Sequence, residues 1–392
     1  MNTKPTYAVS RRSLLRAIAS APLWHAIPAR AIETAADAFD VFDLEAVARA
    51  KLPPAHWAYL ATGTDSELTL NENTAAFSRW YLRPRRLVDV RAPDLTTEIL
   101  GETWPSPLAL TPLSSQRAFD PEGEVATARA ARAGRYRMIL SNVASVGVEE
   151  VTAACGEPVW MQLYATARWD VARAVIRRAE AAGSRVIVLT VDLPTYSNRL
   201  TLLRGMRADS RDCTACHRGS PGRDQHLKPM YAGTGLGADE FRASGLTWEF
   251  LQRMRDSTHM RIVVKGIVTR EDAARCLAAG VDGIIVSNHG GRSDDTGRAA
   301  IDSLPEVVAV AGGKVPVLVD SGFRRGTDVL KALALGASAV NIGRPYAWGL
   351  AAFGESGVAR AMEIIRTELE TNMRLVGAPS IADISPDLVA HA

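Results

Sequence analysis

The chain has 392 residues, of which 47% are apolar and 23% charged, a composition typical of a globular protein with room for one large barrel or two ordinary domains. Four cysteines are too few for a disulfide scaffold, and no apolar run is long enough for a helix that spans a bilayer. The first 31 residues hold five of the 46 Lys and Arg and no acid, so the remaining 41 basic and 43 acidic residues give a net charge of −2 and no argument for nucleic-acid binding.

Residues 1–31 are predicted to be a twin-arginine signal peptide. Residues 10–15 read SRRSLL, a mildly apolar stretch follows over residues 17–29, and Ala29-Arg30-Ala31 offers a small-residue cleavage site. A basic disordered tail is the alternative. Because the twin-arginine route exports folded proteins, the signal predicts a periplasmic protein, residues 32–392, whose cofactor binds tightly in the cytoplasm before export.

Helical patterns open this main segment. Asp43 is expected to cap a helix over residues 44–50, and Pro53-Pro54 to start a second helix that ends at Gly63. After residue 100, short apolar runs alternate with helical segments such as 168–182, 269–279 and 327–335. The runs are apolar on both faces, as parallel strands buried in a sheet are, and they cover residues 108–111, 138–141, 159–163, 186–191, 262–265, 283–287, 315–320 and 339–342.

Eight such units predict an α/β fold, a (β/α)8 TIM barrel with an N-terminal helical extension. A doubly wound open sheet is the alternative, but no Gly-x-Gly-x-x-Gly turn follows the first strand. One long connection, about residues 200–247, interrupts the alternation after the fourth strand. Polar residues end the predicted strands, and in a barrel these ends meet on one face: Ser114, Ser141, Gln162, Tyr164, Thr190, Asp192, Lys265, His289, Asp320 and Arg344.

The segment Ser287-Asn288-His289-Gly290-Gly291-Arg292 carries the clearest chemical pattern. His289 can take a proton, and Arg292 can bind a carboxylate, just beyond a buried strand. A hydrogen-bonded loop histidine is the alternative reading of this motif alone. Together the two residues favour an enzyme that acts on a small organic acid.

Taken together, these motifs resemble the FMN-dependent 2-hydroxy acid oxidase and dehydrogenase family, over about residues 39–384. The resemblance implies an FMN site. Arg324 and Arg344 would bind the phosphate, Asp320 the ribityl hydroxyls, and Lys265 the pyrimidine edge of the ring. Family members usually carry alanine or glycine at the position of Ser114, near the reactive N5, so the resemblance leaves the preference for an electron acceptor open. The other residues expected near FMN are Leu113, Ser114, Ser141, Gln162, Thr190, Ser287, Gly322 and Gly343.

The resemblance also implies the substrate site. Arg199 and Arg292 would hold the substrate carboxylate, with Tyr59 adding a hydroxyl. His289 would be the base, taking the proton from the 2-hydroxyl or, in a competing scheme, from C2. Asp192 would stabilise its imidazolium, and Tyr164 would bond the substrate hydroxyl. Glycolate oxidase carries a tryptophan at the position of Val143, so this chain is expected to accept a larger substrate, such as lactate or mandelate.

The long connection contains Cys213-Thr214-Ala215-Cys216-His217, which matches the attachment motif of c-type haem. His217 would be the proximal ligand, and Met206, His226 or Met230 could supply the sixth. A disulfide, or a zinc site that adds His226, are the alternatives. Cys155 and Cys276 are expected to be small core residues.

The sequence thus predicts a periplasmic enzyme that oxidises an L-2-hydroxy acid and passes the electrons to a cytochrome or a quinone-linked acceptor. An oxidase that uses oxygen, a flavoprotein electron carrier without turnover and a flavin-dependent isopentenyl diphosphate isomerase are the alternatives. The paired arginines argue against the isomerase, and the complete set of substrate residues argues against the carrier. Family resemblance alone implies a homotetramer.

Overall fold

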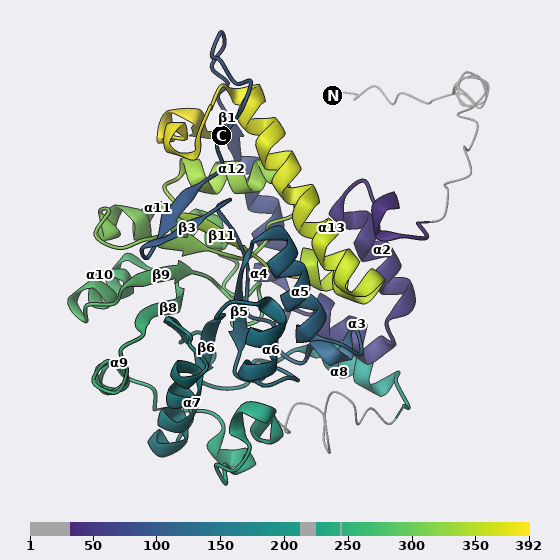
Figure 1. Ribbon diagram of the computed structural model, residues 1–392, viewed down its shortest axis with the longest axis vertical. Coiled ribbons are helices and arrows are strands. Elements are labelled where there is room, and N and C mark those ends of the chain that lie inside the picture. The colour runs from purple at the N-terminus through teal and green to yellow at the C-terminus, as the bar shows by residue number, and fades with distance from the viewer. Residues whose placement is uncertain (1–31, 212–224, 244) are drawn as a thin grey trace, which may run out of the picture. The chain divides into compact units, whose positions relative to one another are not determined.

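The computed structural model describes residues 32–211, 225–243 and 245–392, and its centre is a closed barrel of eight parallel strands (Figure 1). The predicted (β/α)8 barrel is confirmed, because each of the eight predicted apolar runs overlaps one barrel strand. The strands, buried along most of their length, are β4 (Leu108–Leu110), β5 (Arg137–Ser141), β6 (Trp160–Tyr164), β7 (Val186–Thr190), β8 (Arg261–Ile267), β9 (Gly283–Val286), β10 (Val317–Val319) and β11 (Ala339–Ile342).

Helices surround the barrel. In α7 the residues Val171, Ala172, Val175, Ile176 and Ala179 form one buried stripe at helical spacing, which explains why this segment packs on the sheet as a helix. The outer helices are α5 (Glu124–Gly134), α6 (Val148–Cys155), α7 (Trp169–Ala181), α9 (Trp248–Arg255), α10 (Arg270–Ala278), α11 (Ala300–Ala311), α12 (Gly326–Ala334) and α13 (Arg344–Val376). Cys155 and Cys276 are buried, as expected.

A hairpin of β2 (Thr97–Ile99) and β3 (Glu102–Trp104) contributes to the core inside the barrel. Ile99 and Trp104 are buried against residues of the barrel strands, and the Trp104 and Trp160 rings meet edge to face at 5.4 Å. Trp160 begins β6, so the amino-terminal end of the barrel is filled. The carboxyl ends of the strands are therefore left as the open face.

The N-terminal helical extension consists of α2 (Val41–Lys51), α3 (Pro54–Ala61) and α4 (Leu68–Ala75). The prediction that Asp43 caps the first helix is wrong by three residues. Asp40 is the N-cap and accepts hydrogen bonds from the Phe42 and Asp43 amides, while the Asp43 carboxylate accepts one from the Asp40 amide. This reciprocal capping box needs two acids three residues apart, and it starts the helix earlier.

The long connection after β7 begins with a helix, α8 (Leu200–Arg207), which the sequence pattern does not predict. It packs on α3, and Gly205 makes the close approach possible, because an added Cβ would lie 2.4 Å from the Ala58 Cβ. The described parts that follow hold only short 3-10 turns: η4 (Gln225–Leu227), η5 (Pro229–Tyr231) and η6 (Ala238–Glu240).

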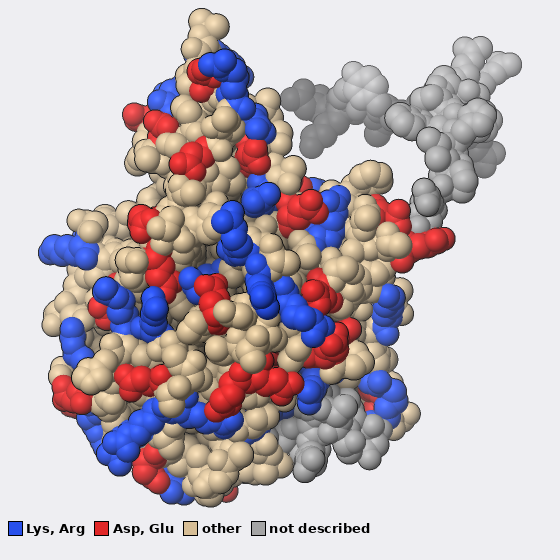
Figure 2. Space-filling view, viewed as in Figure 1, with Lys and Arg blue, Asp and Glu red and all other residues tan. Residues whose placement is uncertain are grey.

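The last strand, β12 (Val389–His391), pairs with β1 (Trp80–Leu82) and ties the C-terminal segment to the chain that follows the N-terminal helices. None of the helices in the described ranges is long and apolar enough to cross a membrane. On the face in Figure 2, Lys and Arg are interspersed with Asp and Glu. The remaining 3-10 turns are η1 (Ala35–Asp37), η2 (Ala76–Arg79), η3 (Gln116–Ala118), η7 (Ile381–Asp383) and η8 (Pro386–Leu388).

Candidate active site

A cavity with an empty volume of about 1110 Å³, its open mouth included, lies at the carboxyl ends of the barrel strands. Its walls carry six Lys and Arg side chains but one carboxylate, Asp320. Such an excess of cations suits anionic ligands. The predicted site residues that line it are Tyr59, Leu113, Ser114, Ser141, Tyr164, Arg199, Lys265, His289, Arg292, Asp320, Gly322, Arg324, Gly343 and Arg344.

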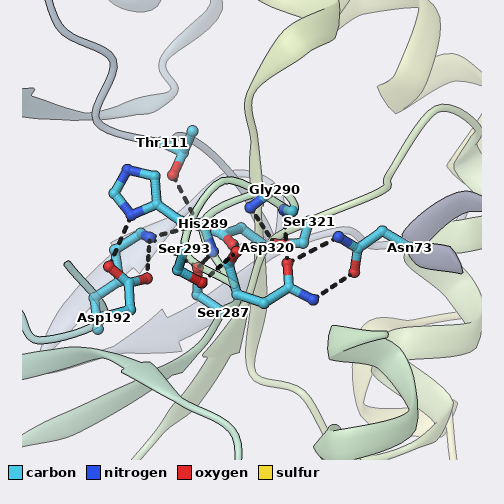
Figure 3. Close-up of polar contacts among 12 residues, drawn as sticks. Asn73, Thr111, Asp192, Ser287, His289, Gly290, Ser293, Asp320 and Ser321 are labelled. Atoms are coloured by element: carbon cyan, nitrogen blue, oxygen red, sulfur yellow. Dashed lines mark hydrogen bonds and ion pairs between the residues drawn. The ribbon is translucent and has the colours of Figure 1, made fainter. Parts of the chain in front are cut away.

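His289 is held on both ring nitrogens. Its Nδ1 donates to Asp192 Oδ1 at 2.8 Å (Figure 3). The Tyr164 hydroxyl donates to its Nε2 at 3.1 Å. The backbone of His289 is left-handed, with φ of 60°, a strained conformation for a residue with a side chain. Burial lowers the pKa of His289 although Asp192 opposes the shift, so the ring is neutral at pH 7 and can accept a proton at Nε2.

Lys265, which is 3% exposed, contacts the same carboxylate as this histidine, that of Asp192. Its ammonium donates to Ser287 Oγ at 2.8 Å and lies 3.4 Å from Asp320 Oδ2 and 3.7 Å from Asp192 Oδ2. Burial opposes the charge, but the two carboxylates outweigh burial and raise the pKa of Lys265. Ser287 Oγ also accepts a hydrogen bond from the His289 amide, so Lys265 and His289 share one anchor.

Two arginines flank Tyr59 from different elements. The Arg292 guanidinium lies 4.4 Å and that of Arg199 5.3 Å from the centre of the Tyr59 ring. The Tyr59 hydroxyl forms a hydrogen bond with Ser114 Oγ. Burial and the neighbouring Arg292 lower the pKa of Arg199 to about 10. Neither arginine forms an ion pair with a carboxylate anywhere in the described ranges, so both are available to an anion.

A second group of cations lies beyond β10 and β11. Arg324 and Arg344 are both partly buried, and burial lowers the pKa of Arg324 to about 10. The three Arg344 nitrogens donate to the carbonyls of Leu60, Thr62 and Gly290, whereas Arg324 makes one hydrogen bond, to the Phe323 carbonyl. Arg324 is therefore the freer of the two for a phosphate.

Gly322 and Gly343 line this part of the cavity, and because they lack side chains, their backbone groups stay accessible to a ligand. Gly322 has φ of 89°, and an added Cβ would lie 2.0 Å from the Asn73 carbonyl oxygen, so only glycine fits. Gly343 is the N-cap of α13, whose first amides lack helical partners. A helix start beside Arg324 is a suitable place for a phosphate.

Two buried polar atoms beside the cavity have no partner in the described structure. Gln162 Oε1 accepts from Ser141 Oγ at 2.9 Å, but Gln162 Nε2 is unpaired, as is Thr190 Oγ1. Gln162 pairs in register with Ser141, and Thr190 with Lys265, both of which line the cavity. Because unpaired buried groups are costly, these atoms indicate a polar ligand edge beside β6 and β7.

The loop that carries His289 is fastened to α4 by a pair of buried amides. Asn73 Nδ2 donates to Asn288 Oδ1, and Asn288 Nδ2 donates to Asn73 Oδ1, both at 2.8 Å (Figure 3). The Gly291 amide also donates to Asn288 Oδ1. The backbone on both sides of His289 is thereby fixed.

Sequence reasoning missed four residues that border or shape the cavity. Thr111 donates to Asp320 Oδ2 at 3.1 Å, and Ser321 donates to Asp320 Oδ1 at 2.8 Å. Thr111 ends a predicted strand and Ser321 follows one, so both could have been found from the sequence. Tyr196 and Arg242 line the cavity from the connection between β7 and α9, where no strand end marks them.

The haem motif cannot be placed, since Cys213, Cys216 and His217 lie outside the described residues. The ranges that are described contain no cluster of three or more potential metal ligands. Met230, one of the suggested sixth ligands of a haem iron, is buried, with 1% of its surface exposed. The haem, disulfide and zinc readings stay predictions.

A model of the FMN-dependent dehydrogenase family matches residues 48–391. The chain belongs to this family. It is an FMN-dependent oxidoreductase that acts on the CH–OH group of 2-hydroxy acids. The family assignment made from the sequence is thus confirmed.

Named relatives and solved structures agree with the family. A peroxisomal (S)-2-hydroxyacid oxidase of Arabidopsis thaliana is 42% identical over 349 residues, covering 88% of this chain and 94% of its own. The 2-hydroxyacid oxidase 2 of Rattus norvegicus is 39% identical, covering 88% and 97%. A crystal structure of mandelate oxidase, 37% identical, superposes with a TM-score of 0.81 and covers 91% of this chain and 98% of its own. A (S)-mandelate dehydrogenase chimera reaches 0.82 at 33% identity, covering 90% and 99%.

The cavity fits FMN. The unpaired Gln162 Nε2 and Thr190 Oγ1 offer polar atoms to a ring edge, next to the Lys265 ammonium. Arg324 and the start of α13 offer charge and amides to a phosphate. Holding arginines partly buried without a carboxylate partner is costly, and a bound anion would offset that cost.

Proposed function

We propose that the enzyme oxidises an L-2-hydroxy acid to the 2-oxo acid with His289 as the base. The observation that carries the proposal is His289, hydrogen-bonded to Asp192 and Tyr164, in one cavity with two arginines that lack carboxylate partners in the described ranges. Arg199 and Arg292 bind the substrate carboxylate, and the Tyr59 hydroxyl adds a hydrogen bond.

Proton transfer follows from the contacts of His289. The substrate 2-hydroxyl binds beside Nε2 and the Tyr164 hydroxyl, whose pKa burial raises to about 12, so Tyr164 remains a donor. Nε2 takes the hydroxyl proton when hydride leaves C2, or the C2 proton in the carbanion scheme. Asp192, whose pKa His289 and Lys265 lower in spite of its burial, stays ionised and stabilises the imidazolium.

FMN, when bound, accepts the two electrons that leave C2. Three groups of residues would hold it. Lys265, Gln162, Thr190 and Ser141 would contact the ring, Asp320 the ribityl chain, and Arg324 with Arg344 the phosphate. Leu113 and Ser114 lie on the cavity wall near Tyr59. These assignments are supported by the cavity lining and the unpaired buried atoms.

A substrate larger than glycolate is supported by Val143, which lines the cavity. The relatives named 2-hydroxyacid oxidase and mandelate oxidase support a lactate-like or mandelate-like acid.

The acceptor separates two versions of the function. The names of the relatives favour an oxidase that passes electrons to oxygen. The SRRSLL segment favours export and a periplasmic cytochrome or quinone-linked acceptor, with haem bound at Cys213, Cys216 and His217 as an optional relay. Oxygen consumption during steady turnover supports the oxidase, whereas a reduced-haem absorbance band that rises on addition of substrate supports the relay.

The reductive half-reaction tests the proposal directly. The FMN-loaded enzyme is mixed without oxygen with L-lactate or L-mandelate, with the D-enantiomers as controls, and flavin absorbance is followed. We expect rapid bleaching by an L-acid, slowed by about 10²- to 10⁴-fold in His289→Ala, which keeps its bound FMN. Bound FMN that no L-2-hydroxy acid bleaches would make the protein an electron carrier instead, and bleaching at the wild-type rate in His289→Ala would remove the base from His289.

A further inference from the structure

A third arginine faces the substrate cavity and has no role in the proposed reaction. Arg242 follows η6, in the connection between β7 and α9, and lines the cavity. Its guanidinium lies 4.8 Å from the centre of the Tyr196 ring and 5.0 Å from that of Tyr164. It also lies 5.1 Å from the centre of the Phe241 ring, and stacking on these three rings fixes the orientation of the side chain.

The charge of Arg242 is not neutralised within the described chain. Its Nη1 donates to the Leu193 carbonyl at 3.1 Å, while its buried Nε has no hydrogen-bond partner. None of the carboxylates in the described ranges forms an ion pair with it. A held guanidinium with an unpaired, buried donor is a binding group that lacks its anion.

Arg242 and the carboxylate-binding arginines occupy different parts of the cavity wall. Arg199 and Arg292 lie over the Tyr59 ring, whereas Arg242 lies over Tyr164, whose hydroxyl reaches His289. When the substrate carboxylate (C1) lies at Tyr59 and the 2-hydroxyl at His289, the substrate side chain extends along the remaining wall of the cavity. Val143, Tyr196 and Arg242 belong to that wall.

We propose that Arg242 binds a second carboxylate, so that the preferred substrates are dicarboxylic 2-hydroxy acids of the malate or 2-hydroxyglutarate type. The inference rests on the proposed function, since it uses the same orientation of the substrate. Two substrate carboxylates complement three arginines better than one does, because the cavity offers no acid of its own on this side. The competing possibility is a substrate whose aromatic side chain stacks on Arg242.

The test compares two acids that differ only in the terminal carboxylate. (S)-2-hydroxyglutarate and (S)-2-hydroxypentanoate share a five-carbon chain, and kcat/KM for flavin reduction is measured for each. We expect the wild type to favour the dicarboxylate by about tenfold, a preference that weakens as salt is added. In Arg242→Met the ratio of the two kcat/KM values falls about tenfold, and Arg242→Lys restores part of it. Arg253→Met is the matched control, because Arg253 also stacks on a ring, that of Trp169, but lies outside the cavity.

Each of the other possible results contradicts one specific claim. If the FMN-loaded wild type is bleached equally by both acids, and Arg242→Met leaves their ratio unchanged, Arg242 does not read the side chain and the proposed function stands. If L-mandelate suffers the larger loss in Arg242→Met, the wall recognises aromatic groups instead of a carboxylate. If no L-2-hydroxy acid bleaches bound FMN, the proposed function itself fails.

Discussion

At the scale of single residues, the site depends on how His289 is held. Its ring is fixed from both sides by Asp192 and Tyr164, and its backbone is held in a left-handed conformation by the Ser287 and Asn288 contacts. The strain of this conformation costs of order 1 kcal/mol, offset by the surrounding hydrogen bonds. The result is a histidine whose unprotonated nitrogen points to where a substrate hydroxyl would bind.

The protonation of His289 predicts a pH dependence. Burial lowers its pKa below the usual 6.5, so the base form is present at pH 7 and kcat/KM should fall only as the pH drops through that lower value. Asp192→Asn removes the charge that raises the pKa of His289, so the acid limb should move to still lower pH, and turnover should fall about 10²-fold or more. The pH profile of anaerobic flavin reduction measures both. An acid limb that moves upward in Asp192→Asn would contradict the assignment.

At the scale of elements, residues far apart in sequence are brought to the cavity by paired helices and loops. The close packing of α3 and α8 at Gly205 sets Tyr59 beside Arg199. Thr201 donates to Glu67 Oε1 at 2.6 Å and ties α8 to the residue before α4. The amide pair of Asn73 and Asn288 then fixes the His289 loop to α4.

This amide pair predicts a loss of stability. Asn73→Ala removes both reciprocal hydrogen bonds and leaves the 3%-exposed Asn288 partly unpaired, so the folded enzyme should lose about 1–3 kcal/mol. Thermal melting of the FMN-loaded protein measures the loss. Asn71→Ala, an exposed site on the same helix, is the control and should stay within about 0.5 kcal/mol of the wild type. Equal melting of the two variants would show that the pair does not support the loop.

At the scale of the whole molecule, the barrel gathers strand ends on one face and fills the other with Ile99 and Trp104. The chemistry is therefore confined to one end. Residues 34–392 form one compact unit.

Export is the prediction that belongs to this scale. In cell fractionation the wild type should be found in the periplasm, shortened by about the first 31 residues, with FMN bound. Replacing both Arg11 and Arg12 by Lys should leave the full-length precursor in the cytoplasm, because twin-arginine export depends on that pair. Recovery of the unprocessed wild type from the cytoplasm would refute the signal.

The sequence by itself determined the eight strands, the barrel and the residues at the strand ends, including His289, Asp192 and Lys265. It could do so because buried parallel strands are continuously apolar, and the polar residue that ends each run must lie on the shared open face. The helix α8, the Asp40 cap, the Asn73–Asn288 pair and the position of Arg242 were decided only by the tertiary structure. Each depends on a contact between segments distant in sequence or on local capping geometry, and neither leaves a periodic pattern in the chain.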